Sequence, residues 1–294
     1  MRSKEQTVKG FMQRHIIIFA VLMLAFAFSH NIINSMITAP FEDSVTASNL
    51  MEALCKYITA LLPLFLMKKW GFVQKAGLRY ILTGVLLGIP SILLIVENLS
   101  PFAVIAPASY KVQWLSVLAI VVANFGVGLM EEACCRGVLL PMLCEKWSGQ
   151  KNCYMKAALF SSALFGCMHF SWIINALVFN GSVSAAECIG RLYQVYYAFC
   201  FGMLCAGVTL LSRSIIPMVI WHSLVDVAAG IGQGILYRTT YQHFFELNPI
   251  GPADVLVKMG ALRDAGLAVW LIPVGADMIL LTAGVIMVKR RTQR

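Results

Sequence analysis

Charged residues are scarce in this chain, and long stretches of it carry almost none. Only 13% of its 294 residues are charged, 59% are hydrophobic, and the mean hydropathy is +0.77. Soluble domains carry about 25% charged residues, so this composition excludes an ordinary soluble fold. Apolar runs of about 20 residues recur, the length needed to cross about 30 Å of hydrocarbon. The composition therefore predicts an all-α, polytopic transmembrane helical bundle.

The chain also lacks cysteine pairs at metal or redox spacing, internal repeats and low-complexity segments. Its nine cysteines are scattered through apolar segments without a CxxC pair, so we interpret them as reduced, buried small side chains. A net charge of +9 would suggest nucleic acid in a soluble protein. Here the basic residues stand in short connections between apolar runs, where they orient a membrane protein. We expect a lipid bilayer as a partner and no nucleic acid.

The apolar runs predict about eight membrane spans, the first of which is expected to be retained because no usual cleavage site follows it. Residues 1–111 hold spans one to three, 112–234 hold spans four to seven, and 235–294 hold an outer interfacial loop and the last span. The fourth run is about 50 Å long at 1.5 Å per residue, so it must bend, tilt or leave the membrane. The eight predicted spans cover about 16–38, 48–67, 79–97, 112–144, 156–178, 193–211, 214–234 and 266–288.

Lys and Arg mark one side of these spans. Basic residues precede the first span and follow the second, fourth and eighth, whereas the 39–47 loop carries Glu42 and Asp43 without Lys or Arg. By the positive-inside rule both termini are cytoplasmic. We expect a multi-pass protein of a cell membrane, the plasma membrane of a bacterium.

Six ionisable side chains interrupt the predicted spans. Each charge costs about 2.5–3.5 kcal/mol at a bilayer centre, so such groups call for a functional or structural reason. Glu132 and Arg136 are four residues apart, share a helix face and can neutralise each other, whereas Glu131 points about 100° away. Counting from the basic span ends puts the deepest groups about 14–21 Å into the bundle. The six are Glu131, Glu132, Arg136, His169, His222 and Asp226.

Each of these groups also has a purely structural interpretation. Glu132 and Arg136 can be an ion pair that locks helices together. His169 can be a core histidine that is hydrogen-bonded to a backbone carbonyl. His222 and Asp226 can be a hydrogen-bonded pair that fixes helix packing. Together, however, a glutamate, two histidines and an aspartate in an apolar pocket are suited to activating water. Four other polar side chains lie near predicted span ends and are interpreted as snorkelling or interfacial: His30, Glu52, Lys56 and Glu97.

Three motifs follow one another along the chain: Glu131-Glu132-x-x-x-Arg136, Phe165-x-x-x-His169 and His222-x-x-x-Asp226. In this order, each inside a span, they resemble the signature motifs of the CAAX protease and bacteriocin-processing family of intramembrane proteases, which includes CAAX prenyl endopeptidases. The resemblance covers about residues 112–230. It implies hydrolysis of a peptide bond in a membrane-associated peptide or protein. The last motif position is commonly asparagine in that family and is Asp226 here.

The resemblance also implies roles for the motif residues. Glu131 with His169 would activate the attacking water, while His222 and Asp226 would stabilise the oxyanion or hold a metal. Glu132, Arg136 and Phe165 would support them. Two cofactor states stay open: none, with Glu131 as the general base, or a divalent metal such as zinc. For zinc, Glu131, His169 and His222 would form a His₂Glu set with water in the fourth position.

Two other classes of function stay open. One is a non-catalytic membrane scaffold or immunity protein built on the same fold. The other is an ion-coupled transporter, which also uses intramembrane carboxylates and histidines. Inverted repeats or polar sites in the first three spans that match the later ones would favour a transporter, and we find neither in the sequence.

The predicted orientation places Thr46 and Asn98 outside the cell and Gln150 inside. In a background without native cysteines, we expect Thr46→Cys to react with a membrane-impermeant thiol reagent in intact cells and Gln150→Cys to react only after lysis, because basic connections stay cytoplasmic. Labelling of position 150 but not of position 46 would reverse the orientation.

Overall fold

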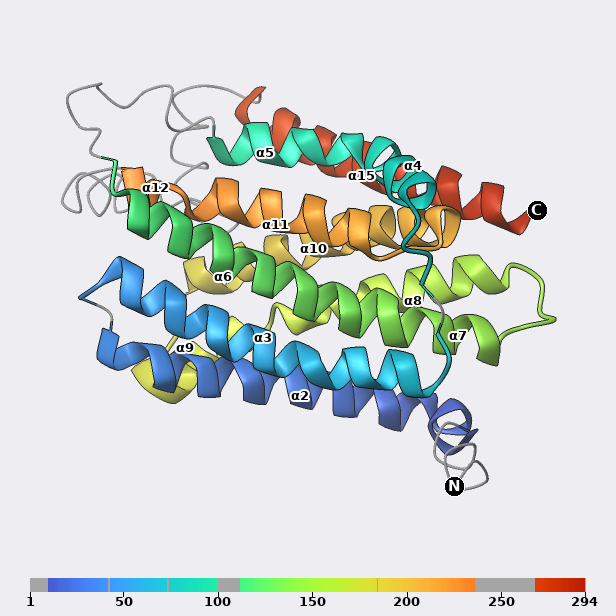
Figure 1. The fold of residues 1–294 in the computed structure, drawn as a ribbon, viewed down its shortest axis with the longest axis horizontal. Coiled ribbons are helices and arrows are strands. Elements are labelled where there is room, and N and C mark those ends of the chain that lie inside the picture. Colours follow the sequence, from blue (N-terminus) through green and yellow to red (C-terminus); the bar gives the residue numbers. More distant parts are fainter. Residues whose placement is uncertain are drawn as a thin grey trace.

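The computed structural model describes residues 10–41, 43–72, 74–99, 112–183, 185–235 and 268–293. These residues are mostly helical, with no strand among them, so the predicted all-α class is confirmed. Most helices run along one long direction and form an elongated bundle (Figure 1). The predicted outer loop at 236–265 lies outside the described residues, and the division of the chain at 112 and 235 stays a prediction.

The first part of the chain forms two long helices and a bent pair. Helices α2 (Ile16–Thr38) and α3 (Val45–Lys69) are joined through η1 (Ala39–Phe41). At the start of α3, Ser44 Oγ accepts a hydrogen bond from the Ala47 N–H at 3.2 Å, a typical N-cap. Helix α4 (Leu78–Leu87) and helix α5 (Ile92–Leu99) flank η2 (Ile89–Ser91), where the chain bends by 48°. Pro90 lies in η2 and has no N–H to continue a helical ladder.

The central segment is one continuous helical stretch of 33 residues with an irregular middle. Helix α6 (Trp114–Glu132) leads into the π-helix η5 (Ala133–Leu139), and α7 (Leu140–Lys146) follows. A π-helical turn is wider than an α-helical turn and is frequent at functional sites. The irregularity expected in this overlong segment therefore begins directly after the two glutamates.

The second half contains the remaining motifs on shorter helices. Helix α8 (Cys153–Met168) ends where the N–H groups of His169 and Phe170 bond to carbonyls only three residues back, and α9 (Ser171–Asn180) follows. Helix α10 (Ala185–Ser212) turns into α11 (Ile216–Gly230) through Arg213, which has a φ of 57°. The last described helices are α12 (Gly232–Ile235) and α15 (Ala268–Thr292).

The count of eight spans is not confirmed. Among the described residues, four helical stretches are long and apolar enough to cross a membrane, or five if the bent pair α4–α5 is one span. Helices α8 and α11 have 16 and 15 residues, which gives about 24 and 22 Å, less than the roughly 30 Å of hydrocarbon. The predicted span 156–178 is two helices, because a hydropathy pattern does not register the turn at His169.

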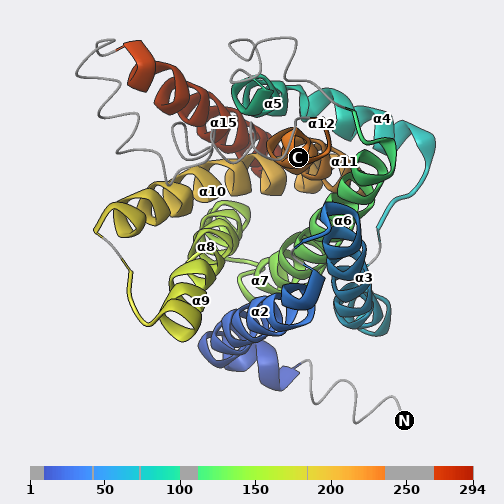
Figure 2. The ribbon, with the colours of Figure 1, turned by 90° about the vertical axis from the view of Figure 1, so that its left-hand side faces the viewer.

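Helix α6 packs against two other helices. Helix α3 runs along one side of it and α11 along another, while α10 packs between α8 and α15 (Figure 2). Close contact between α6 and α11 depends on Gly128. A Cβ atom at this position would overlap Ser223 Oγ and lie 3.1 Å from the carbonyl oxygen of Val219. A residue without a side chain therefore lets the two motif-bearing helices meet.

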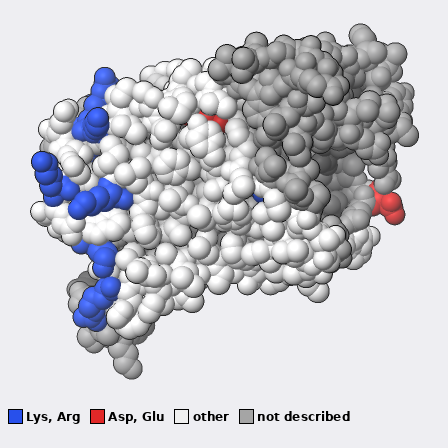
Figure 3. Space-filling model, turned by 180° about the vertical axis from the view of Figure 1, so that it is seen from behind, with Lys and Arg blue, Asp and Glu red and all other residues white. Residues whose placement is uncertain are grey.

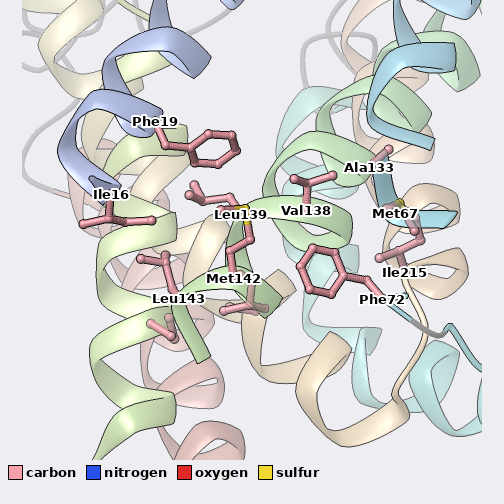
Figure 4. Packing of buried hydrophobic residues seen from close by; sticks show 14 of the residues in the cluster. Ile16, Phe19, Met67, Phe72, Ala133, Val138, Leu139, Met142, Leu143 and Ile215 are labelled. Carbon is pink, nitrogen blue, oxygen red and sulfur yellow. The ribbon is translucent and has the colours of Figure 1, made fainter. Parts of the chain in front are cut away.

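A large apolar cluster surrounds the second half of the central segment (Figure 4). Val138, Leu139 and Met142 project from it toward side chains of α2, of α3 and of the α10–α11 turn. Interiors packed in this way are dense and resist displacement. The cluster therefore immobilises the π-helix that carries Arg136.

Lys and Arg gather at one end of the bundle (Figure 3). Figure 1 shows that α2 begins and α15 ends at this same end. We call it the basic end. Its placement on the cytoplasmic side stays a prediction.

Replacing Gly128 by alanine should destabilise the protein. The added methyl group meets backbone as well as side-chain atoms of α11, and overpacking of this kind costs about 1–3 kcal/mol. The same substitution at Gly275 in α15, where a Cβ would meet nothing within 4 Å, is the matched control. The melting temperatures of the two variants would be measured in the same detergent. A melting temperature for Gly128→Ala equal to that of Gly275→Ala would contradict the close-contact interpretation.

Candidate functional site

Arg136 is fully buried and joins three helical segments to the π-helix. Its Nη1 donates to Glu132 Oε1 at 3.1 Å, and neither side chain is exposed. Its Nη2 donates to the carbonyl oxygen of Gly202 in α10 at 3.1 Å. The guanidinium carbon also lies 4.3 Å from the centroid of the Phe165 ring in α8, a cation–π contact. One side chain thus connects α6, α8 and α10.

His222 of α11 lies against all three carboxylates of the motifs. Its Nδ1 is 3.0 Å from Glu132 Oε1. Its Nε2 is 3.5 Å from Asp226 Oδ2 and 3.7 Å from Glu131 Oε2. An ionised carboxylate only accepts hydrogen bonds, so the Nδ1 proton is the donor to Glu132. This bond orients Nε2 toward the other two carboxylates.

The three carboxylates differ in their access to solvent. The side chain of Glu132 is 0% exposed, that of Glu131 16% and that of Asp226 29%. Adjacent residues on a helix point about 100° apart, which is why Glu132 faces the buried guanidinium and Glu131 does not. The Glu131 and Asp226 carboxylates are therefore partly accessible, whereas Glu132 is sealed in the interior.

His169 joins the cluster through Phe165. It lies at the end of α8, and its Nδ1 is 2.9 Å from the carbonyl oxygen of Phe165. Because a carbonyl oxygen only accepts, Nδ1 carries the proton and Nε2 is the free ring nitrogen. The Phe165 ring packs edge-on against both imidazoles, with centroids 5.1 Å from His169 and 5.7 Å from His222. Within the described structure no hydrogen bond joins His169 to Glu131, although the charge of Glu131 acts on it.

The convergence inferred from depth along the helices is therefore present in the fold. One cluster, built by α6, the π-helix, α8 and α11, contains Glu131, Glu132, Arg136, Phe165, His169, His222 and Asp226. Two neighbours in α10 were not expected as part of the site. The Phe201 ring packs edge-on against His222 at 5.3 Å, and Gly202 accepts from Arg136. Aromatic and glycine residues in an apolar helix carry no sequence signal for such contacts.

The interpretation of Lys56 and His30 as interfacial is wrong. Their exposed fractions are 5% and 7%, and they lie inside α3 and α2, where His30 Nδ1 is 2.8 Å from Thr59 Oγ1. The charge of Lys56 acts on both His30 and Asp226. A buried cation thus lies on the α3 side of the cluster. The only sequence signal was its spacing of four residues from Glu52.

The described side chains do not form a ready metal site. No group of three or more His, Cys, Asp or Glu side chains among them is arranged to hold a metal ion. The possible zinc set of Glu131, His169 and His222 is therefore not assembled in this conformation. We derive no step through a metal.

Comparison with known proteins agrees with the motifs. Residues 113–228 match the family model described as type II CAAX prenyl endopeptidase Rce1-like. All three motifs lie within this segment, so the resemblance seen in the sequence is confirmed there. No curated protein and no solved structure matches the chain.

Removing Arg136 should unfold much of the protein. Arg136→Ala leaves the Glu132 carboxylate buried without its cation, and breaking a buried pair from one side costs about 3–5 kcal/mol. Glu131→Gln is the control, because this side chain is partly exposed and outside the pair. The test compares the folded yield and the melting temperature of the two purified variants. Equal values would show that the pair contributes little to stability.

Proposed function

We propose that this chain, whose residues 113–228 match an Rce1-like protease family, is an intramembrane endopeptidase. It would hydrolyse a peptide bond in a membrane-associated peptide or protein. The observation that carries the proposal is the contact of His222 Nε2 with two partly exposed carboxylates, Glu131 and Asp226. Peptide hydrolysis needs an activated water and a stabilised oxyanion. In this arrangement a carboxylate can accept a proton from the water, and the imidazole can donate a hydrogen bond to the oxyanion.

Glu131 is the proposed general base. It is partly exposed and takes no part in the buried ion pair. Glu131 would take a proton from water as the hydroxide attacks the carbonyl carbon, and would return it to the leaving amine. His169 would help to hold this water through its free Nε2. No direct bond joins the two side chains at rest, and catalytic contacts of this kind commonly tighten only when substrate binds.

His222 and Asp226 are the proposed oxyanion-stabilising pair. Since Nδ1 already donates to Glu132, Nε2 can donate to an oxyanion only when the imidazole carries a second proton. Before substrate binds, a proton on Nε2 would face the Asp226 carboxylate, whose Oδ2 lies 3.5 Å from Nε2. Glu132, held by Arg136, would fix the orientation of the ring, as the buried aspartate does in a serine protease triad.

The setting of the reaction follows from the position of the cluster. Its residues lie on apolar helices of a multi-pass membrane protein, below a basic end that we propose is cytoplasmic. Substrates would then be cut within or at the membrane, on the cytoplasmic side of a bacterial plasma membrane.

Replacing the base should abolish cleavage without unfolding the protein. General acid–base help is worth about 10²–10⁴-fold, so Glu131→Gln should lower cleavage by at least this factor. His169→Ala and His222→Ala should be comparably impaired, and double variants little worse than single ones because the groups act as a unit. A membrane-anchored peptide library, incubated with the purified protein in liposomes, identifies a cleaved sequence for these assays. Asp43→Asn, at the α2–α3 connection, is the control.

Two outcomes would revise the proposal. Full cleavage by Glu131→Gln would remove the protease assignment from this cluster and favour a non-catalytic scaffold. A chelator should leave cleavage unchanged if Glu131 acts directly as the base. Loss of cleavage that zinc restores would instead support a metal held by Glu131, His169 and His222.

A further inference from the structure

An open cavity of about 580 Å³ lies at the basic end, and Arg136 is one of its lining residues. Its walls come from the segment after α3, from η5 and α7, and from the facing ends of α8, α10 and α15. His169, His222, Glu131 and Asp226 do not line it. It is therefore distinct from the proposed catalytic cluster, and its size is that of a small-ligand site.

The wall of this cavity is strongly cationic. Lys75, Arg213 and Arg291 line it together with Arg136, whose charge Glu132 already balances, against the single carboxylate of Glu145 among the lining residues. Glu145 Oε2 already accepts a hydrogen bond from Gln13 Nε2 at 2.6 Å. A concave wall with such an excess of one charge concentrates ions of opposite sign. The ligand that fits it is an anion.

Unused hydrogen-bond donors point to the same conclusion. Thr209 is 7% exposed and Arg136 0%, yet Thr209 Oγ1 and Arg136 Nε have no hydrogen-bond partner in the described structure, and neither has Arg291 Nε. All three side chains line the cavity. Buried polar atoms in native proteins nearly always have a partner. Each of these three can donate, so an acceptor that reaches them through the cavity wall would supply the missing partner.

A backbone contact joins the two segments that carry Lys75 and Arg213. Lys75 N–H donates to the carbonyl oxygen of Arg213 at 2.8 Å, and Gln74 Oε1 accepts from the N–H of Ile215. Arg213 has a left-handed φ of 57°, a conformation that non-glycine residues keep only when their surroundings impose it. The guanidinium of Arg291 lies 5.3 Å from the Tyr154 ring centroid. The backbones of Lys75 and Arg213 and the guanidinium of Arg291 therefore have defined places beside the cavity.

We propose that this cavity binds a phosphate group. A phosphate group offers several acceptor oxygens and carries one negative charge in a phospholipid diester or nearly two in inorganic phosphate. It suits the guanidinium groups of Arg213 and Arg291, the ammonium of Lys75 and the unpartnered Nε–H of Arg136. The group can belong to an anionic phospholipid or to a soluble phosphate. Leu140, Pro141 and Leu210 in the same wall suit a lipid, and basic pockets between transmembrane helices are typical headgroup sites. Neither source requires the proposed protease activity.

To test the proposal, we would measure the melting temperature of the full-length protein in a neutral detergent while a ligand is titrated in. One arm adds inorganic phosphate. A second adds short-chain phosphatidylglycerol, with zwitterionic phosphatidylcholine as a counterpart that has the same phosphodiester but no net charge. A ligand that binds only the folded state raises the melting temperature. We expect Arg213→Gln and Arg291→Gln each to weaken binding by about tenfold or more, because each removes charge-assisted hydrogen bonds. Thr209→Val keeps the charge and the size and should also weaken binding.

Arg290→Gln is the matched control, since it removes the same charge one residue away from Arg291 at an exposed position outside the cavity. Response to phosphatidylglycerol alone supports a lipid headgroup, and response to both ligands supports a site for phosphate itself. The proposal is overturned if neither ligand raises the melting temperature of the wild-type protein. It is also overturned if Arg290→Gln weakens binding as much as Arg291→Gln. If the arginine variants do not fold, Thr209→Val decides, and unchanged binding by that variant rejects the site.

Discussion

Burial of the Glu132–Arg136 pair is the constraint on which the rest of the site depends. Neither charge has access to water, so the two neutralise each other and their remaining polar atoms need partners on other helices. Arg136 meets this need with Gly202 and Phe165, and Glu132 meets it with His222. A buried ion pair is weak evidence for stability, because well-packed apolar residues can replace it without loss. Its value here is the orientation that it imposes on the imidazole of His222.

That orientation separates the carboxylates into two kinds. Glu132 is sealed inside and acts on Nδ1 of His222, while Glu131 and Asp226 remain partly exposed beside Nε2. The separation results from helix geometry together with the close approach of α6 and α11 at Gly128. An apolar environment strengthens each of these electrostatic contacts relative to water. The arrangement therefore combines a rigid buried anchor with reactive groups that a substrate can reach.

Arg136 also connects this cluster with the basic end of the molecule. Its Nη atoms hold Glu132 and Gly202, while its Nε is unpartnered in the wall of the cationic cavity. One guanidinium thus forms the partition between a proposed catalytic cluster and a proposed phosphate site. Because the apolar cluster around Val138 and Leu139 immobilises the π-helix, the two sites share a wall that moves little.

The sequence alone could determine features that depend on one helix at a time, such as its hydropathy and the spacing of residues along it. Hydropathy identified an all-helical membrane protein, the four-residue spacing identified the Glu132–Arg136 pair, and three ordered motifs predicted the family model that residues 113–228 match. Only the tertiary structure decided that His222 contacts Glu132 from 90 positions away, that Phe201 and Gly202 complete the cluster, and that Lys56 is buried. The eight-span count is not confirmed among the described residues, since turns at His169 and Gly88 interrupt apolar runs that hydropathy reads as continuous. Short-range contacts follow from the fixed 3.6-residue period of the helix, whereas contacts between helices depend on packing that no single segment encodes.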